Sequence, residues 1–239
     1  MAELDARPKR PVVKARFQLL QYINVLRICY LRKTSIIYIT QLRFTSLHFK
    51  MKDLQLPIPA EFRSELHHVD ALDKRSDKEI LESLSKHVPV TSEKNVWAYW
   101  HSGAVSMPSW CQRNVVNWIR LCGPSWSVRV LDSVPGSPNN ALEWANEEML
   151  PETFVKGTMD GPYVGPHSAD FLRGACLYNY GGVWMDVGII LIRRLDSICW
   201  KQLEDPNSPF EVSVPLMYGQ VMANHFVASR KGNPFIKRW

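Results

Sequence analysis

The spacing of apolar side chains changes several times along this chain of 239 residues, and each change marks an expected element. Residues 96–100 form an unbroken apolar run, which predicts a buried central strand. Residues 111–122 carry apolar side chains at helical spacing and precede Gly123-Pro124, so an amphipathic helix is expected to end there. Residues 126–130 alternate between apolar and polar side chains, which predicts a second strand.

The later part of the chain continues this succession of helices and strands. Helical spacing predicts helices over residues 140–149 and 168–180, with a loop rich in glycine and proline between them. Short apolar runs predict strands over residues 183–186 and 189–192. Such an order of strands and helices indicates an α/β fold, in which helices are layered on a sheet.

Composition divides the chain into three parts: residues 1–55, 56–94 and 95–239. The first part is a basic arm, which we expect to be poorly ordered or amphipathic. The second is a linker, and within it Ser76 and Glu79 have the spacing of a capping box, which predicts a short helix. The third part contains all the expected strands and is therefore the α/β domain.

The net charge of +6 is not spread evenly over the chain. Residues 1–50 carry ten Lys and Arg and two Asp and Glu, a net charge of +8, whereas the remaining residues carry 19 basic and 21 acidic side chains, a net charge of −2. The α/β domain thus has no excess of positive charge, which argues against a nucleic-acid partner.

The apolar stretch of the arm, residues 17–49, is interrupted by four basic side chains. The runs between them are far shorter than the roughly 20 residues that a membrane-spanning helix needs. The arm fits a solvated extension, an amphipathic helix in peripheral contact with a membrane, or a degenerate signal anchor. We expect a protein that is cytoplasmic or peripheral to the Golgi or another membrane.

Several classes of site are disfavoured by what the sequence lacks. The five cysteines are odd in number and show no CxxC spacing, which argues against a zinc site or a disulfide framework. No GxGxxG, P-loop, GxSxG or HExxH pattern occurs in the chain. Their absence argues against dehydrogenase, kinase, hydrolase and zinc-protease functions.

Asp186 is the first candidate for chemistry. The glycine pair Gly181-Gly182 allows the chain to leave the preceding helix, and a short apolar strand then leads to this carboxylate. Open α/β sheets bind ligands at the carboxyl ends of their strands, where Asp186 is expected to lie. Taken alone, the residue is equally well explained as an aspartate that caps a turn.

Further candidates lie at the same end of the expected sheet. Asp170 and Arg173 are three residues apart and share a helix face. The carboxylate suits sugar hydroxyl groups and the guanidinium suits phosphate, although a surface ion pair is the plain alternative. His167, beside the expected helix start, is a candidate phosphate ligand or a local cap. Trp100, at the end of the first strand, is a candidate stacking surface or a core residue.

In combination, these motifs resemble the capsular polysaccharide synthesis proteins. Members of this family are similar to glycosyltransferases with a DXD sugar-binding region, such as the α-1,6-mannosyltransferase-like enzymes. The resemblance covers about residues 95–239 and is carried by residues 96–100, 107–108, 168–173, 180–186, 224–226 and 231–235.

The resemblance implies a GT-A-type nucleotide-diphospho-sugar transferase fold with a Rossmann-like mixed sheet. It assigns Asp170, Arg173 and Asp186 to the site of the donor sugar and diphosphate, with Gly181 and Gly182 shaping the approach. Asp186 is then the candidate ligand of a Mn²⁺ or Mg²⁺ ion. The implied partners are a nucleotide-sugar donor and a glycan or other acceptor with a hydroxyl group, and the implied reaction is sugar transfer between them.

Gly188 departs from the family pattern, because stricter relatives carry the second acid of the DXD motif there. In addition, residues 231–239 resemble the start of a helix, so the fold is expected to be C-terminally incomplete. Both features favour an alternative function, a non-catalytic sugar-nucleotide-binding or scaffold subunit. A third hypothesis is a membrane-surface or nucleic-acid binder that acts through residues 1–55.

Overall fold

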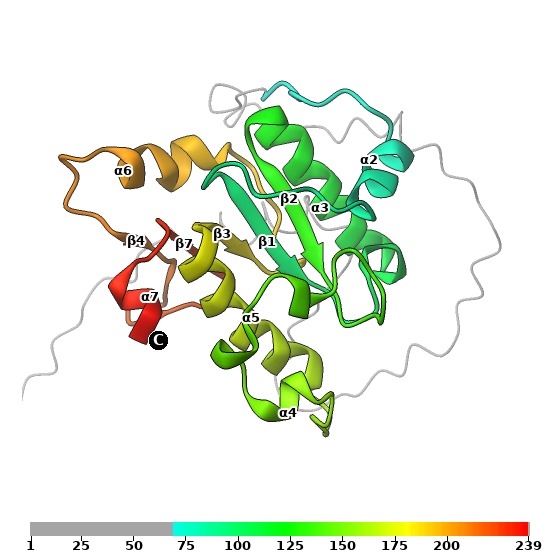
Figure 1. The fold of residues 1–239 in the computed structure, drawn as a ribbon. Helices are drawn as coiled ribbons and strands as arrows, with labels where there is room; N and C mark the ends of the chain where they lie inside the picture. The colour runs from blue at the N-terminus through cyan, green and yellow to red at the C-terminus, as the bar shows by residue number, and fades with distance from the viewer. Residues whose placement is uncertain (1–68, 239) are drawn as a thin grey trace, which may run out of the picture. The chain divides into compact units, whose positions relative to one another are not determined.

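A computed structural model describes residues 69–238, and a mixed five-stranded sheet lies at its centre (Figure 1). The strand order is β2-β1-β3-β7-β4. Strands β2, β1 and β3 are parallel, whereas β7 is antiparallel to both of its neighbours, β3 and β4. The expected α/β class is therefore confirmed. The strands are β1 (Asn95–Tyr99), β2 (Ser127–Leu131), β3 (Gly182–Met185), β4 (Val212–Ser213) and β7 (Phe226–Ser229).

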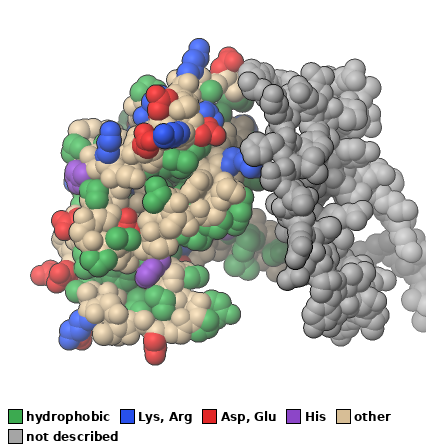
Figure 2. Space-filling model, turned by 90° about the vertical axis from the view of Figure 1, so that its right-hand side faces the viewer, with side chains coloured by type: hydrophobic (Ala, Val, Ile, Leu, Met, Phe, Trp, Pro, Cys, Tyr) green, Lys and Arg blue, Asp and Glu red, His purple; other side chains and the backbone are tan. Residues whose placement is uncertain are grey.

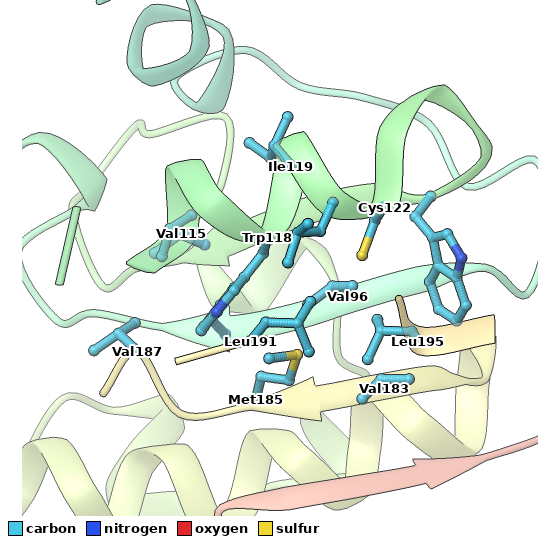
Figure 3. Packing of buried hydrophobic residues seen from close by; sticks show 14 of the residues in the cluster. Val96, Val115, Trp118, Ile119, Cys122, Val183, Met185, Val187, Leu191 and Leu195 are labelled. Carbon is cyan, nitrogen blue, oxygen red and sulfur yellow. The ribbon is translucent and has the colours of Figure 1, made fainter. Parts of the chain in front are cut away.

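Two long helices cover the two faces of the sheet (Figure 1). Side chains of α3 pack on Val96, Val183 and Met185, as Figure 3 shows, while α5 packs on Trp97 and Trp184. Successive strand residues point to opposite faces, so a sheet covered on both sides needs the unbroken apolar runs seen here. The helices are α2 (Asp77–Leu84), α3 (Ser109–Cys122), α4 (Glu152–Val155), α5 (Val164–Tyr180), α6 (Lys201–Glu204) and α7 (Pro234–Arg238).

Helix α3 has the buried stripe that its sequence predicts. Cys111, Val115, Trp118 and Cys122 are all essentially inaccessible to solvent. Burial of an apolar side chain the size of valine contributes about 1.5–3 kcal/mol, so this stripe fixes the helix on the sheet. The helix ends as expected at Gly123, whose φ of +63° suits glycine and few other residues.

The expected helix over residues 140–149 is not present as one element. Two short 3₁₀ turns, Ala141–Glu143 and Glu147–Met149, replace it. Asn140 starts the first turn with its side chain, which accepts a hydrogen bond from the backbone of Leu142. Asparagine side chains compete with helical backbone hydrogen bonds in this way, and a second asparagine, Asn146, precedes the second turn.

The expected strand over residues 189–192 is also wrong, because this segment is irregular. Its carbonyl groups bind side chains of α3 instead of a neighbouring strand. Trp118 donates to Ile189 O (2.9 Å) and Asn117 donates to Leu191 O (2.7 Å), while Asn114 donates to Val187 O just before the segment (3.0 Å). The segment is consequently anchored to a helix, and its alternate isoleucines face solvent.

Residues 69–94, expected as a linker, lie against the α/β domain. Ser76 and Glu79 form the predicted capping box at the start of α2, and Ile80 and Leu84 of this helix are buried in the core. Charged side chains of both signs gather at the top of the face in Figure 2, at the height of α2 in Figure 1. Arg120 of α3 and Asp77 of α2 form an ion pair of 2.7 Å.

Arg129 of β2 is buried, although the alternation of the sequence places it on a polar face. Its guanidinium donates to the carbonyl oxygens of Val88 and Pro89 and to the side chain of Asn95. Burial lowers the pKa of Arg129 to about 10. The residue therefore joins the segment before β1 to the edge of the sheet.

The predictions for residues 1–55 lie outside the described residues. Within residues 69–238, no helix combines the length and the apolar character needed to cross a membrane.

Candidate functional site

Helix α5 positions the first two site residues. It begins at Val164, not at Ser168 as expected, so Asp170 and Arg173 lie in its interior. Pro166 fits within the first turn, where a missing backbone N–H breaks no helical hydrogen bond. Because Asp170 and Arg173 are one turn apart on the same face, both side chains reach the carboxyl end of β3.

Arg173 is buried and binds two carboxylates at once. Its Nη1 donates to Oδ1 of Asp170 over 2.7 Å, and its Nη2 donates to Oδ1 of Asp186 over 3.4 Å. The guanidinium carbon lies 5.3 Å from the centre of the Trp184 ring. Only 3% of the Arg173 side chain is exposed, against 45% for Asp170 and 44% for Asp186. Arg173 thus fixes the two carboxylates, and the carboxylates face the solvent.

Asp186 follows β3 directly and is oriented from that strand. Nε1 of the fully buried Trp184 donates to Oδ1 of Asp186 over 2.8 Å. The backbone N–H of Asp186 donates to the carbonyl oxygen of His225 over 2.9 Å. Both side-chain donors to Asp186 bind Oδ1, so Oδ2 accepts no hydrogen bond within residues 69–238 and is available to a ligand.

Asn224 completes the group from a distant part of the chain. Its Nδ2 donates to Oδ1 of Asp170 over 3.0 Å. The antiparallel register of β3 and β7 pairs Met185 with Phe226, and this places the residues just before β7 beside those just after β3. No local pattern in the sequence indicates this contact, because the two residues are 54 positions apart.

These side chains face a cavity of about 630 Å³ at the carboxyl ends of β1 and β3. Asp170, Arg173, Asp186 and Trp100 of the predicted site all line it. Its size falls within the range of roughly 300–1,000 Å³ that small-molecule sites occupy. The structure therefore brings four of the seven predicted site residues together in one place.

The other three predicted site residues do not line this cavity. His167 is exposed on α5, with its ring 6.2 Å from that of Tyr163. Gly181 and Gly182 lie at the opposite end of β3, where both have positive φ angles, 69° and 110°. A Cβ atom on Gly182 would collide with the carbonyl oxygen of Asn95. The two glycines therefore allow a tight helix-to-strand connection and are too distant to shape the approach to Asp186.

The end of β1 supplies further residues of the cavity. Tyr99 and His101 both line the cavity. The Tyr99 hydroxyl lies 2.7 Å from Oγ of Ser133, and burial raises the pKa of the phenol above its usual value. The hydrogen bond with Ser133 therefore fixes the Tyr99 hydroxyl at the end of β1.

The charges around the cavity bear on which ligands it suits. The two carboxylates and Arg173 together carry one excess negative charge, and Arg173 is the only Lys or Arg among the lining residues. In the described part of the chain, no cluster of three or more His, Cys, Asp or Glu side chains offers a complete metal site. Hydroxyl donors, or a cation that brings further ligands with it, match this arrangement best.

Comparison with known proteins gives the family of this chain. Residues 52–239 match the model of the family described as capsular polysaccharide synthesis protein. The protein named "Probable glycosyltransferase FCK3" from Fusarium pseudograminearum is 54% identical over 78% of this chain and 47% of its own length. The "O-glycosyltransferase braB" from Annulohypoxylon truncatum is 49% identical over 71% of this chain and 41% of its own length.

A solved structure named "PaToxG Glycosyltransferase" is similar to a lower degree. It has a TM-score of 0.39 and 16% identity, over 67% of this chain and 63% of that chain. The chain spans less than half the length of the curated relatives that it matches. The match over residues 52–239 and the identity of 54% confirm the resemblance of the sequence motifs, and the chain belongs to the capsular polysaccharide synthesis protein family.

Proposed function

We propose that this protein is a glycosyltransferase of the GT-A type, which moves a sugar from a nucleotide-diphosphate donor to a hydroxyl group. The observation that carries the proposal is the convergence of Asp170, Arg173 and Asp186 on one cavity at the strand ends. Relatives that are 49% and 54% identical bear the name glycosyltransferase, which supports the same reaction class.

The reaction exchanges one bond for another at the anomeric carbon of the sugar. The acceptor oxygen forms a bond to this carbon, and the bond to the diphosphate oxygen breaks. The electron pair leaves with the nucleoside diphosphate, and the hydroxyl proton passes to solvent. The protein contributes mainly by holding the sugar in a reactive orientation and by stabilising the charge that develops.

The two carboxylates are suited to the orienting role. Oδ2 of Asp186 and Oδ2 of Asp170 are acceptors beside a buried guanidinium, and sugar hydroxyl groups are donors of matching strength. Arg173 is a positioning residue, because only 3% of its side chain is exposed and its Nη1 and Nη2 bind Asp170 and Asp186. The phosphate role that the sequence predicted for it is therefore not part of the proposal.

Charge on the diphosphate then needs another partner. Mg²⁺ is commonly bound by one or two protein carboxylates together with substrate phosphates. A single free oxygen of Asp186 fits a Mg²⁺ or Mn²⁺ ion that arrives with the donor, and it does not fit a resident ion. Such an ion would supply positive charge for the leaving diphosphate. Binding of Mn²⁺, followed by electron paramagnetic resonance, should accordingly require UDP.

The decisive experiment measures donor hydrolysis by the full chain over a panel of UDP- and GDP-sugars, with and without Mn²⁺. Asp186→Ala should lower the rate by about a hundredfold if the carboxylate stabilises the transition state. Asp160→Ala removes an exposed acid outside the cavity and should leave the rate unchanged. If the wild type binds a nucleotide sugar but turns over none, the non-catalytic subunit, which Gly188 favours, is the correct function.

A further inference from the structure

An apolar groove of about 380 Å³ lies next to the donor cavity, and the proposed donor site does not use it. One wall is the segment 189–192, which carries three isoleucines and a leucine. Val214, Pro215 and Phe226 contribute to the other wall. None of the lining residues is Lys, Arg, Asp or Glu, so the groove suits an uncharged ligand.

Consecutive residues connect the groove to the donor cavity along both walls. Gly188 lines the cavity, and the next residue, Ile189, lines the groove. Likewise, Asn224 lines the cavity and His225 lines the groove. The hydrogen bond from Asp186 N to His225 O joins the two walls. A ligand in the groove is therefore adjacent to the residues that hold the donor.

The apolar surface extends beyond the groove itself. Ile190 and Ile192 are 68% and 74% exposed, which is unusual for isoleucine. The hairpin of β5 (Leu216–Met217) and β6 (Val221–Met222), which follows Pro215, also exposes apolar side chains. The side chains that border the groove are thus apolar, and the volume of the groove is within the range of small-molecule sites.

We propose that this groove binds the apolar body of a neutral alcohol, which is the acceptor of the sugar. The hydroxyl group of this alcohol reaches the donor cavity past Gly188, which lines the cavity next to Ile189 of the groove and carries no side chain. Ser213 and His225 are the polar residues of the groove and can bind further oxygen atoms of the acceptor. The acceptor role rests on the proposed glycosyltransferase function, whereas binding of the alcohol does not.

The groove is tested by equilibrium binding to the full chain without any donor, with cyclododecanol and maltose as probes. Cyclododecanol is a neutral apolar alcohol, and maltose is a polar glycan with the same number of carbon atoms. Ile190→Glu places a carboxylate in the groove and should weaken cyclododecanol binding about tenfold, because an unpaired charge is costly among apolar groups. Val105→Glu is the matched control, since Val105 is equally exposed, at 67%, and lies outside the groove.

The proposal is supported if cyclododecanol binds the wild type more tightly than maltose and if Ile190→Glu alone weakens this binding. Tighter binding of maltose, or equal losses in both variants, would overturn it. It would also be overturned by sedimentation of the wild type as a dimer that Ile190→Glu dissociates, with no alcohol bound. Sugar transfer to cyclododecanol is then measured with the active donor. Alcohol binding without any donor turnover would refute the proposed function and, with it, the acceptor role.

Discussion

Trp184 and Asp186 are joined by a hydrogen bond of 2.8 Å from the indole Nε1 to Oδ1, between alternate residues at the end of β3. Alternate residues of a strand share a face, so the bond follows from the strand itself. Arg173 binds the same oxygen from α5. The orientation of the Asp186 carboxylate is therefore set by two donors from two elements, and its other oxygen faces the cavity.

Replacing Trp184 with phenylalanine should separate this positioning effect from stability. Trp184→Phe removes the donor and leaves a smaller ring in a fully buried position, which should cost about 2 kcal/mol of unfolding free energy. Because Asp186 then loses one of its two donors, donor hydrolysis should fall about tenfold. Urea unfolding and the hydrolysis rate are measured on the same samples.

Trp97→Phe is the matched control for this prediction. Trp97 is also fully buried, and its Nε1 donates over 3.0 Å to the carbonyl oxygen of Gly181, which lies at the other end of β3 from Asp186. The Trp97→Phe variant should lose about as much unfolding free energy as Trp184→Phe, and its rate of donor hydrolysis should stay that of the wild type. Equal losses of activity in both variants would show that Trp184 acts only through the fold.

Much of the fold can be predicted because its signals are local. The strand β1, the stripe of α3 and the position of Asp186 follow from periodicity and turn residues within short windows. The segment 189–192 is wrongly predicted as a strand because an apolar run does not reveal its hydrogen-bond partners. Here the partners are side chains of α3, which lie about 70 residues earlier in the chain.

The site is predictable only in part, for the same reason. Asp170 and Arg173 share a helix face, so their proximity follows from the sequence. The contact of Asn224 with Asp170 depends on β7, a strand of four residues whose pairing with β3 is non-local. Gly181 and Gly182 do form the predicted helix-to-strand connection. They lie at the start of β3 and Asp186 lies after its end, so the strand separates the glycine pair from the site.

Gly182 should be far less tolerant of substitution than Gly174. Gly182→Ala introduces a Cβ atom at a φ of +110° and into the carbonyl oxygen of Asn95, and it should cost about 3 kcal/mol. Gly174 lies inside α5, where an added Cβ atom would meet no neighbouring atom within 4 Å, so Gly174→Ala should gain about 0.5–1 kcal/mol. Urea denaturation measures the unfolding free energy of both variants. A neutral Gly182→Ala variant would contradict the close approach of β3 to β1.

Glu93 should make the stability of the protein depend on pH. Its Oε2 accepts from Arg230 Nε and Lys231 N, and its Oε1 accepts from Arg230 Nη2, each over 2.8 Å. The hydrogen bonds from Arg230 lower the pKa of Glu93 below its usual value of 4.5. The unfolded state then binds a proton more readily, so this stabilisation is present above about pH 4.5 and is lost as the pH falls through the lower, folded pKa.

Glu93→Gln should therefore be less stable than the wild type at pH 7, and the difference should shrink as the pH is lowered from about 5 to about 3. Thermal or urea unfolding across this range measures the difference. Glu148→Gln, which alters an exposed carboxylate, should parallel the wild type at every pH. A constant gap between Glu93→Gln and the wild type would show that the Glu93–Arg230 contact has no part in the pH dependence.

Gly188 offers a direct test of the cation proposed for the donor. Its φ lies outside the left-handed region, and a Cβ atom there would meet the Trp110 ring at 3.7 Å, an ordinary van der Waals distance. Gly188→Asp should therefore fold normally and place a second carboxylate beside Asp186. With UDP present, Mn²⁺ should bind about tenfold more tightly than to the wild type, because a further oxygen ligand becomes available.

Gly188→Asn separates the charge of this substitution from its size. The amide has the shape of the carboxylate but its oxygen carries no charge, so Mn²⁺ affinity should rise much less than in Gly188→Asp. Both variants, however, add a side chain at the rim between cavity and groove, and both should slow sugar transfer to cyclododecanol relative to donor hydrolysis. If Gly188→Asp leaves Mn²⁺ affinity unchanged, Asp186 does not face the diphosphate. If neither variant alters the ratio of transfer to hydrolysis, the acceptor does not pass Gly188.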